Sequence, residues 1–251
     1  MFFGFNLNEI FMFPVKDDES RKHFYVGIAV SLLAFIVPFV PYIILFGYGA
    51  QIAKQIINGE SPRMIAWTDW GKLFKDGLKV FGARLVIGLP ILIFVLPIMI
   101  ISFAFPFVME NASAREAESM ALVFTVIMLG FTCFIFPVSL VMAVIIPAPE
   151  MHVIEKDDFT AVFQFREWWK IFRANLGGFI AAFGIYYIVS FVMAFAMQIL
   201  LATLILACLL IVLLPAMTIY ITLIMYAVGA MAYKDGKTKL AQISESSNAS
   251  A

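Results

Sequence analysis

Long apolar stretches without a single charged residue constrain this chain more than any other feature. Residues 85–107 and 121–147 form two of them, and residues 177–233 form a longer run that must fold back on itself. A helix needs about 20 apolar residues to cross the ~30 Å hydrocarbon layer of a membrane. We expect the long run to divide into helices near 177–198 and 203–233. The sequence therefore predicts an all-α integral membrane protein with four full crossings.

The composition supports a lipid environment. Of the 251 residues, 63% are hydrophobic and 14% are charged, whereas a soluble domain is about half apolar and about a quarter charged. The formal net charge is zero, which removes any case for a nucleic-acid partner. Cys133 and Cys208 both lie in apolar runs, so we interpret them as packing residues rather than as a disulfide or zinc site.

Residues 24–53 form a further apolar stretch, which we interpret as a short hairpin that enters the membrane and returns. Pro38 and Pro41 favour a turn, because proline removes a backbone donor and disfavours helix in the residue before it. Gly47 follows them, and each half is short for a full crossing. The alternative is a single crossing of the whole stretch.

The positions of the basic residues favour the hairpin. Cytoplasmic loops of membrane proteins are enriched in lysine and arginine. A hairpin at 24–53 places all of the 17 lysine and arginine residues except Arg115 on one side, whereas a single crossing moves Lys16, Arg21 and Lys22 to the opposite face. We therefore expect both termini in the cytoplasm. Residues 2–13 are expected to lie on the membrane surface, residues 1–236 to form one membrane domain, and residues 237–251 to be a disordered polar tail.

Two short segments align without gaps. Residues 74–85 read FKDGLKVFGARL, and residues 165–176 read FREWWKIFRANL. Each shows the period of an amphipathic helix, has a candidate N-cap upstream (Asp69 or Thr160) and precedes an apolar hairpin. The pattern predicts a duplicated unit, 68–149 and 160–233, in which a cytoplasmic interfacial helix precedes two membrane helices. The alternative is that two unrelated interfacial helices resemble one another.

All four tryptophans lie in or beside these segments, and tryptophan favours the headgroup level of a membrane. Lysine and arginine on the opposite face would meet anionic lipid. The candidate interface residues are Trp67, Trp70, Lys72, Lys75, Lys79, Arg166, Trp168, Trp169, Lys170 and Arg173. They form either a structural anchor or a dedicated site for lipid or for a membrane-protein partner, which includes a second copy of this chain.

A family resemblance follows from motifs in the first part of the chain. The chain has FPVKDDESRK (13–22), Gly47-Tyr48, Gly59-Glu60, Pro62 and WTDWGKLFKDGLK (67–79). In these it resembles an uncharacterised prokaryotic family, the domain of unknown function numbered 4013, over nearly the whole chain up to the tail. The residues RMIA between Pro62 and Trp67 make its spacing longer than the family pattern. The resemblance implies a multi-pass protein of a prokaryotic cytoplasmic membrane and implies no activity.

The sequence contains little that resembles an active site. The predicted crossings hold no Asp, Glu, Lys, Arg or His, and no HExxH, GxSxG or phosphate-loop motif is present. The segment PEMHVIEKDD (149–158) gathers Glu150, His152, Glu155, Asp157 and Asp158. A metal site could use these residues, and a solvated helix–loop junction explains them equally well. We predict no metal, no cofactor and no enzymatic activity.

Prolines inside the apolar helices leave a second function open. Proline-broken helices line substrate cavities in some transporters, so Pro97, Pro137 and Pro215 mark candidate breaks. Ser139 and Thr218 would line such a cavity, or they simply pack helices together. The leading hypothesis is an accessory or scaffold protein that organises the membrane through its basic, Trp-bearing collar. The alternative is a small transporter for an uncharged or lipid-like substrate.

Overall fold

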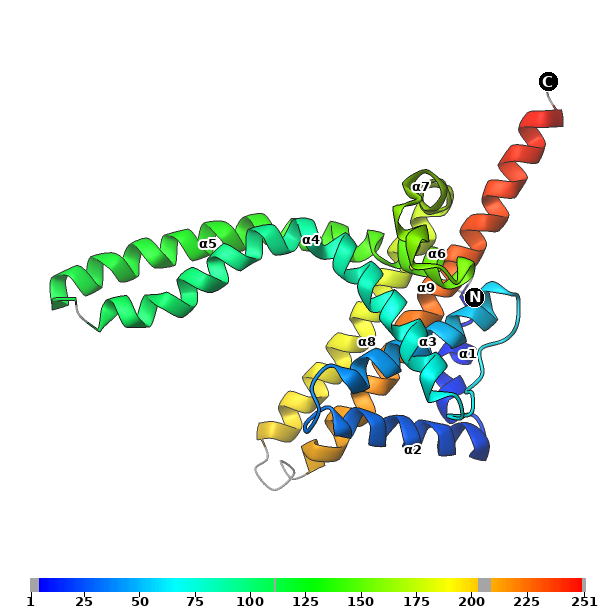
Figure 1. The fold of residues 1–251 in the computed structure, drawn as a ribbon, viewed down its shortest axis with the longest axis horizontal. Coiled ribbons are helices and arrows are strands. Elements are labelled where there is room, and N and C mark those ends of the chain that lie inside the picture. Colours follow the sequence, from blue (N-terminus) through cyan, green and yellow to red (C-terminus); the bar gives the residue numbers. More distant parts are fainter. Residues whose placement is uncertain (1–4, 111, 203–208, 250–251) are drawn as a thin grey trace. The chain divides into compact units, whose positions relative to one another are not determined.

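The computed structural model describes residues 5–110, 112–202 and 209–249, which are almost entirely helical. In chain order the helices are α1 (Leu7–Met12), η1 (Phe13–Val15), α2 (Asp18–Leu33), α3 (Val40–Ile57), α4 (Trp70–Met109), α5 (Ala114–Ile145), α6 (Pro147–Lys156), η2 (Phe159–Phe163), α7 (Phe165–Ala174), α8 (Leu176–Ala202) and α9 (Leu210–Ala249) (Figure 1). The chain divides into unit 1, residues 1–84 and 145–251, and unit 2, residues 85–144. The predicted all-α architecture is confirmed.

Within the described ranges, four helical segments are long and apolar enough to cross a membrane. They are Trp70–Met109, Ala114–Lys156, Leu176–Ala202 and Leu210–Ser246. These segments contain the four crossings that the sequence predicts, although Thr203 and the rest of the expected turn lie outside the described residues. The structure therefore confirms four long apolar helices.

Unit 2 is a pair of helices, the end of α4 and nearly all of α5. Its helices touch through aromatic side chains, since Phe105 stacks on Phe124 at 4.1 Å and Phe94 meets Phe134 edge-on at 6.0 Å. No described residue of α5 is buried, and Phe103 of α4 is 75% exposed. Exposed apolar surface on this scale requires an apolar partner such as lipid.

Unit 1 is built around α9, which contacts α1, α2, α3, α6, α7 and α8 (Figure 1). Its inner residues are almost completely buried, including Leu223, Tyr226, Ala230 and Tyr233. Small residues let the neighbouring helices approach closely. The backbones of α3 and α4 meet at Gly47 and Gly77, where a Cβ on either glycine would lie 1.8 Å from a carbonyl oxygen of the other helix.

The chain turns between α2 and α3 within residues 34–39. Pro38 lies in this connection, and Phe39 has a positive φ of 71°. Pro41 lies in the first turn of α3, where its missing N–H costs no helical hydrogen bond. Helices α2 and α3 contact each other.

The structure differs from the sequence analysis in where three sets of helices begin, break or end. Helix α4 begins at Trp70 and continues to Met109, so the first expected interfacial helix is the start of a longer helix. Pro97, Pro137 and Pro215 lie inside continuous helices rather than at breaks, which membrane helices tolerate when the freed backbone groups find other partners. The expected disordered tail is helical to Ala249, because residues 237–249 contain no proline or glycine.

The N-terminal segment also differs from its prediction. We expected residues 2–13 to lie on the membrane surface, yet Phe5, Ile10 and Phe13 are buried inside unit 1. The hydroxyl of Tyr220 on α9 donates a hydrogen bond to the carbonyl of Phe11 at 3.1 Å. Phe5 and Phe13 therefore pack against protein.

Candidate functional site

The charged residues of α6 connect it to the helices around it. Glu150 is 2% exposed and forms a bidentate ion pair with Arg84 of α4, in which Arg84 Nη2 donates to Glu150 Oε2 at 2.9 Å. The Arg84 guanidinium also lies over the ring of Phe46, 4.9 Å from its centre. The pair therefore joins α4 to α6, and a ring of α3 covers the cation.

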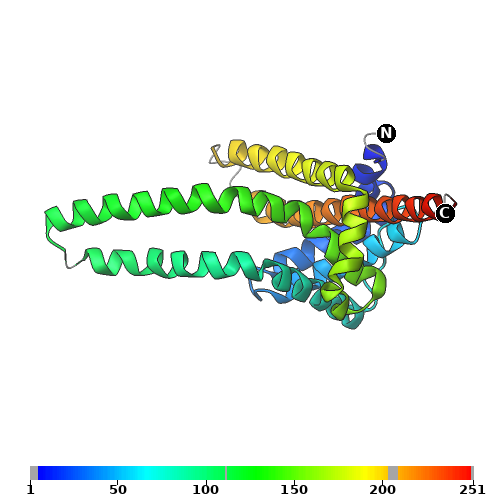
Figure 2. The same ribbon diagram turned by 90° about the horizontal axis from the view of Figure 1, so that it is seen from above.

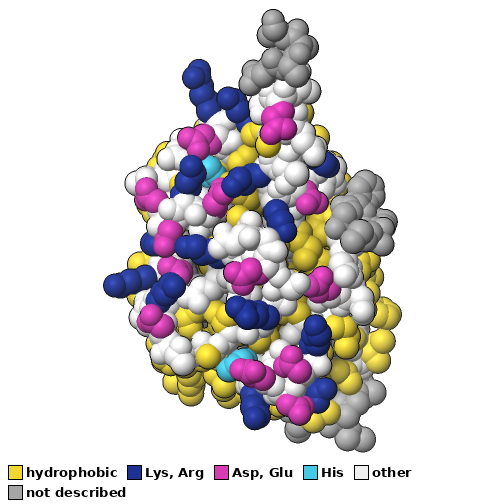
Figure 3. Space-filling view, turned by 90° about the vertical axis from the view of Figure 1, so that its right-hand side faces the viewer, with side chains coloured by type: hydrophobic (Ala, Val, Ile, Leu, Met, Phe, Trp, Pro, Cys, Tyr) yellow, Lys and Arg dark blue, Asp and Glu magenta, His cyan; other side chains and the backbone are white. Residues whose placement is uncertain are grey.

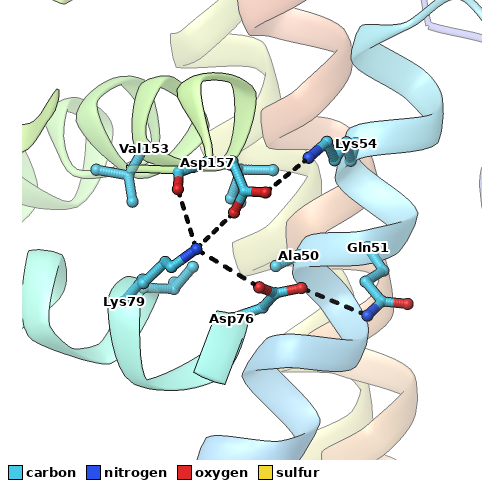
Figure 4. Close-up of a pocket in the computed structure, with 9 residues that line it drawn as sticks. Ala50, Gln51, Lys54, Asp76, Lys79, Val153 and Asp157 are labelled. Atoms are coloured by element: carbon cyan, nitrogen blue, oxygen red, sulfur yellow. Dashed lines mark hydrogen bonds and ion pairs between the residues drawn. The ribbon is translucent and has the colours of Figure 1, made fainter. Parts of the chain in front are cut away.

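A second cluster joins α6 to α3 and α4 through Asp157 (Figure 4). Lys79 donates to Asp157 Oδ1 at 2.6 Å, and Lys54 donates to Asp157 Oδ2 at 3.4 Å. Asp76 lies 3.8 Å from Lys79 and accepts from Gln51 at 3.4 Å. The hydrogen bond from Lys79, helped by the charge of Lys54, holds the pKa of Asp157 below its ordinary value of 3.8.

The space between these side chains is about 20 Å³. That volume holds about one water molecule, so it excludes an organic substrate. Asp157 itself has a positive φ of 55° at the end of α6, which aspartate tolerates better than most residues. The cluster is an electrostatic link between three helices.

A third connection runs from α6 to α9. His152 is 1% exposed, and its Nδ1 lies 2.6 Å from the hydroxyl of Tyr233 while its Nε2 lies 3.0 Å from Gln164 Oε1. Tyr233 donates to Glu155 at 2.7 Å, and Lys237 forms an ion pair with Glu155. The histidine, tyrosine, carboxylate and lysine thus form one chain of hydrogen bonds.

These contacts decide between the two interpretations of residues 149–158. Among the described residues, no group of three or more His, Cys, Asp or Glu side chains could hold a metal ion. The junction is solvated only at its end, because Asp157 and Asp158 are exposed whereas Glu150 and His152 are buried. The sequence segment is instead an ion-pair network, and its partners Arg84, Tyr233 and Lys237 come from other parts of the chain.

The first half of α4 presents three faces. Leu73, Gly77 and Val80 are buried against the protein. Trp70, Phe74 and Leu78 are exposed, although their helical period alone groups them on one apolar face with the buried Leu73. Lys72 and Lys75 are exposed on the third face, and Asp69 is the N-cap, with its carboxylate accepting from the Lys72 N–H at 2.9 Å.

Helix α7 is a separate amphipathic helix that lies crosswise to α8 and α9 (Figures 1 and 2). Trp168, Ile171 and Phe172 are buried on one side, while Arg166, Lys170 and Arg173 are exposed on the other. Its N-cap is Gln164 rather than the expected Thr160, whose N–H is bound by Asp158. The chain bends at Asn175 before α8 begins.

The tryptophans serve partly as core residues. Trp67 is 8% exposed, stacks on Tyr48 at 4.0 Å and donates its indole N–H to the carbonyl of His23. Trp168 is also buried and donates to the carbonyl of Val162. Trp70 is exposed and Trp169 is half-buried. Only the last two therefore remain available to meet a membrane.

Five of the candidate cations have no ion-pair partner among the described residues: Lys72, Lys75, Arg166, Lys170 and Arg173. Lys79 differs, because Asp157 binds it. Seven acidic side chains of unit 1 form ion pairs with lysine or arginine, namely Asp18, Glu60, Asp76, Glu150, Glu155, Asp157 and Glu167. Figure 3 shows a face crowded with charges of both signs, and the pairing leaves an excess of unpaired cations on α4 and α7.

The two candidate cavity residues bond to their own helices. Ser139 donates to the carbonyl of Phe136 at 2.7 Å, and Thr218 donates to the carbonyl of Leu214 at 2.9 Å. Such back-bonding satisfies a hydroxyl without a polar cavity. The hydroxyl protons of both side chains are therefore already bound by their own helices.

Comparison with known proteins bears on the whole chain. Neither a curated protein nor a solved structure matches it. The model of one family, described as proteins of unknown function (DUF4013), matches residues 30–202. This match covers more than half of the chain and confirms the resemblance seen in its motifs, so the protein belongs to the DUF4013 family.

Proposed function

We propose that this protein is a non-enzymatic, multi-pass component of a prokaryotic cytoplasmic membrane, which organises anionic lipid at the inner leaflet. The observation that carries this proposal is the set of five unpaired cations on α4 and α7, which we name the cationic collar: Lys72, Lys75, Arg166, Lys170 and Arg173. Seven acidic side chains of unit 1 form ion pairs with other lysine or arginine residues, so the collar keeps its charge for an external partner.

The proposed placement follows the apolar helices. With α8 and α9 across the membrane, α7 lies along its surface, because it is crosswise to both of them (Figure 2). Helices α2 and α3 enter the membrane and return, and both termini are cytoplasmic. The exposed side chains of Trp70, Phe74 and Leu78 then meet the acyl boundary while Lys72 and Lys75 meet headgroups.

The magnitude of the interaction is sufficient for such a role. A basic residue near an anionic membrane surface contributes about 1 kcal/mol, and the collar offers several. The alternative function of a transporter receives less support, because the hydroxyl groups of Ser139 and Thr218 donate to carbonyls of their own helices.

The proposal is tested by native mass spectrometry of the full-length protein with phosphatidylglycerol. The double variant Lys72→Gln/Lys75→Gln should retain fewer lipid molecules, and the loss should shrink at high salt, where exposed charges are screened. The matched control is Arg21→Gln/Arg63→Gln. It removes the same formal charge from two cations that are already paired with Asp18 and Glu60.

Equal retention by the wild type and the collar variant would remove the lipid role. Equal loss in both variants would also contradict it, because net charge alone would then explain the binding. A thermal melt of each variant checks that the fold is intact.

A further inference from the structure

An open cavity of about 540 Å³ lies where α7 meets α8, beside α9. Its wall combines two cations with one carboxylate, since Arg173 comes from α7 and both Asp235 and Lys239 come from α9. Gly177 also lines it, and a Cβ added to this glycine would meet nothing within 4 Å. The cavity is large enough for a lipid headgroup.

The position of Lys239 is fixed by a buried asparagine. Asn175 is 4% exposed. Its side-chain amide donates to the carbonyl of Ala232 at 2.9 Å, and its Oδ1 accepts from Lys239 Nζ at 2.6 Å. Asn175 thereby holds the ammonium of an otherwise exposed lysine at the wall of the cavity. Arg173, on the opposite element, is exposed and has no ion-pair partner within the described residues.

The cavity continues onto an apolar surface. Leu176 belongs to its wall and is about half exposed, and Ile180, one turn further along α8, is also about half exposed. Both belong to a helix that is long and apolar enough to cross a membrane. A ligand that fits this sequence of surfaces has a charged head and an apolar tail, which points to a phospholipid rather than to a free phosphate compound.

We infer that the cavity binds one phospholipid whose headgroup carries both a phosphate and an ammonium group. The phosphate lies between Arg173 and Lys239, the ammonium faces Asp235, and an acyl chain follows Leu176 and Ile180. A headgroup with a phosphate and only hydroxyl groups can give Asp235 hydrogen bonds, but it offers the carboxylate no opposite charge, so its contact with Asp235 is weaker. This inference goes beyond the proposed function, because the cationic collar attracts any anionic lipid whereas this cavity selects one kind of headgroup.

The full-length protein is first equilibrated with equal amounts of phosphatidylethanolamine and phosphatidylglycerol and is then delipidated in steps. The test identifies the lipid that remains bound last. Wild-type protein should keep phosphatidylethanolamine last. Asp235→Asn should lower the ethanolamine-to-glycerol ratio of that last lipid about two- to fivefold, the value of one partly exposed ion pair. Arg173→Gln and Gly177→Leu should lower retention of both lipids, by removing a phosphate contact and by filling the cavity.

The matched control lies on the same helix as Asp235 but outside the cavity wall, Glu245→Gln on α9. This variant should not change the ratio. An ethanolamine-to-glycerol ratio that Asp235→Asn leaves unchanged would overturn the inference. The inference would also be overturned if soluble phosphoethanolamine displaced the bound lipid as readily as phosphatidylethanolamine does, because the acyl chain would then contribute nothing. Neither result depends on Lys72 or Lys75, so failure here is distinct from failure of the collar.

Discussion

The first half of α4 and helix α7 carry similar residues in the same order, yet they form different structures. Helix α4 runs on without a break to Met109, whereas α7 ends at Ala174 and the chain bends at Asn175. Three aligned positions also differ in what surrounds them. The pairs are Gly77 and Trp168, Lys79 and Lys170, and Arg84 and Asn175.

The aligned residues have different contacts because different elements pack against the two helices. Gly77 lets the backbone of α3 approach α4 closely, while Trp168 is buried and donates to the carbonyl of Val162. Lys79 is bound by Asp157, while Lys170 has no partner in the part of the chain that the structure describes. An amphipathic period therefore identifies a helix and its faces, and the neighbouring elements decide which face is structural.

The largest expected effect comes from the third pair. Arg84→Gln leaves Glu150 buried and without its cation, which should lower the free energy of unfolding by about 3–5 kcal/mol. The measurement is a thermal melt of the purified protein in detergent. Replacing both partners, as in Arg84→Met/Glu150→Leu, should recover much of this loss, because no buried charge remains unpaired. A single variant as stable as the wild type would contradict the ion pair.

The next effect concerns the close approach of α3 and α4. Gly77→Ala places a Cβ against the carbonyl of Ile43, so the helices must separate, at a cost of about 1–3 kcal/mol. The control is Gly71→Ala in the same helix, where the nearest atom to the new Cβ is 3.8 Å away. If both variants melt at the same temperature, the contact between these helices is looser than described.

The smallest effect separates the two aligned lysines. Lys79→Gln removes a partly exposed ion pair with Asp157 and should lower the free energy of unfolding by about 0.2–1 kcal/mol. Lys170→Gln should leave stability unchanged, because no described residue pairs with Lys170. Both variants remove one positive charge, so equal melting temperatures would show that Lys79 is as free as Lys170.

Much of the fold could be predicted because it depends on local composition. Stretches such as 85–107 must be helical in lipid, where every backbone polar group needs an internal partner. The break at Asn175 and the continuity of α4 could not be predicted in the same way, because both depend on long-range contacts. Asn175 is held by Ala232 and Lys239, which follow it by more than fifty residues.

The candidate site was predictable only in part. The period of α7 placed Arg166, Lys170 and Arg173 on an exposed face, and the structure agrees. The partners of α6 were missed, although one signal was present. Arg84 is the last charge before the apolar run that begins at Leu85, and Glu150 is the first after the run that ends at Pro147. Charges at the two ends of a hairpin come together when its helices are antiparallel.

That ion pair also sets an order of events during synthesis. Arg84 and Glu150 are 66 positions apart, and everything between them belongs to the apolar hairpin or its immediate ends. At about 5–20 residues per second, the ribosome needs several seconds to deliver the glutamate after the arginine. Unit 1 therefore cannot close around this ion pair until the whole hairpin has left the ribosome.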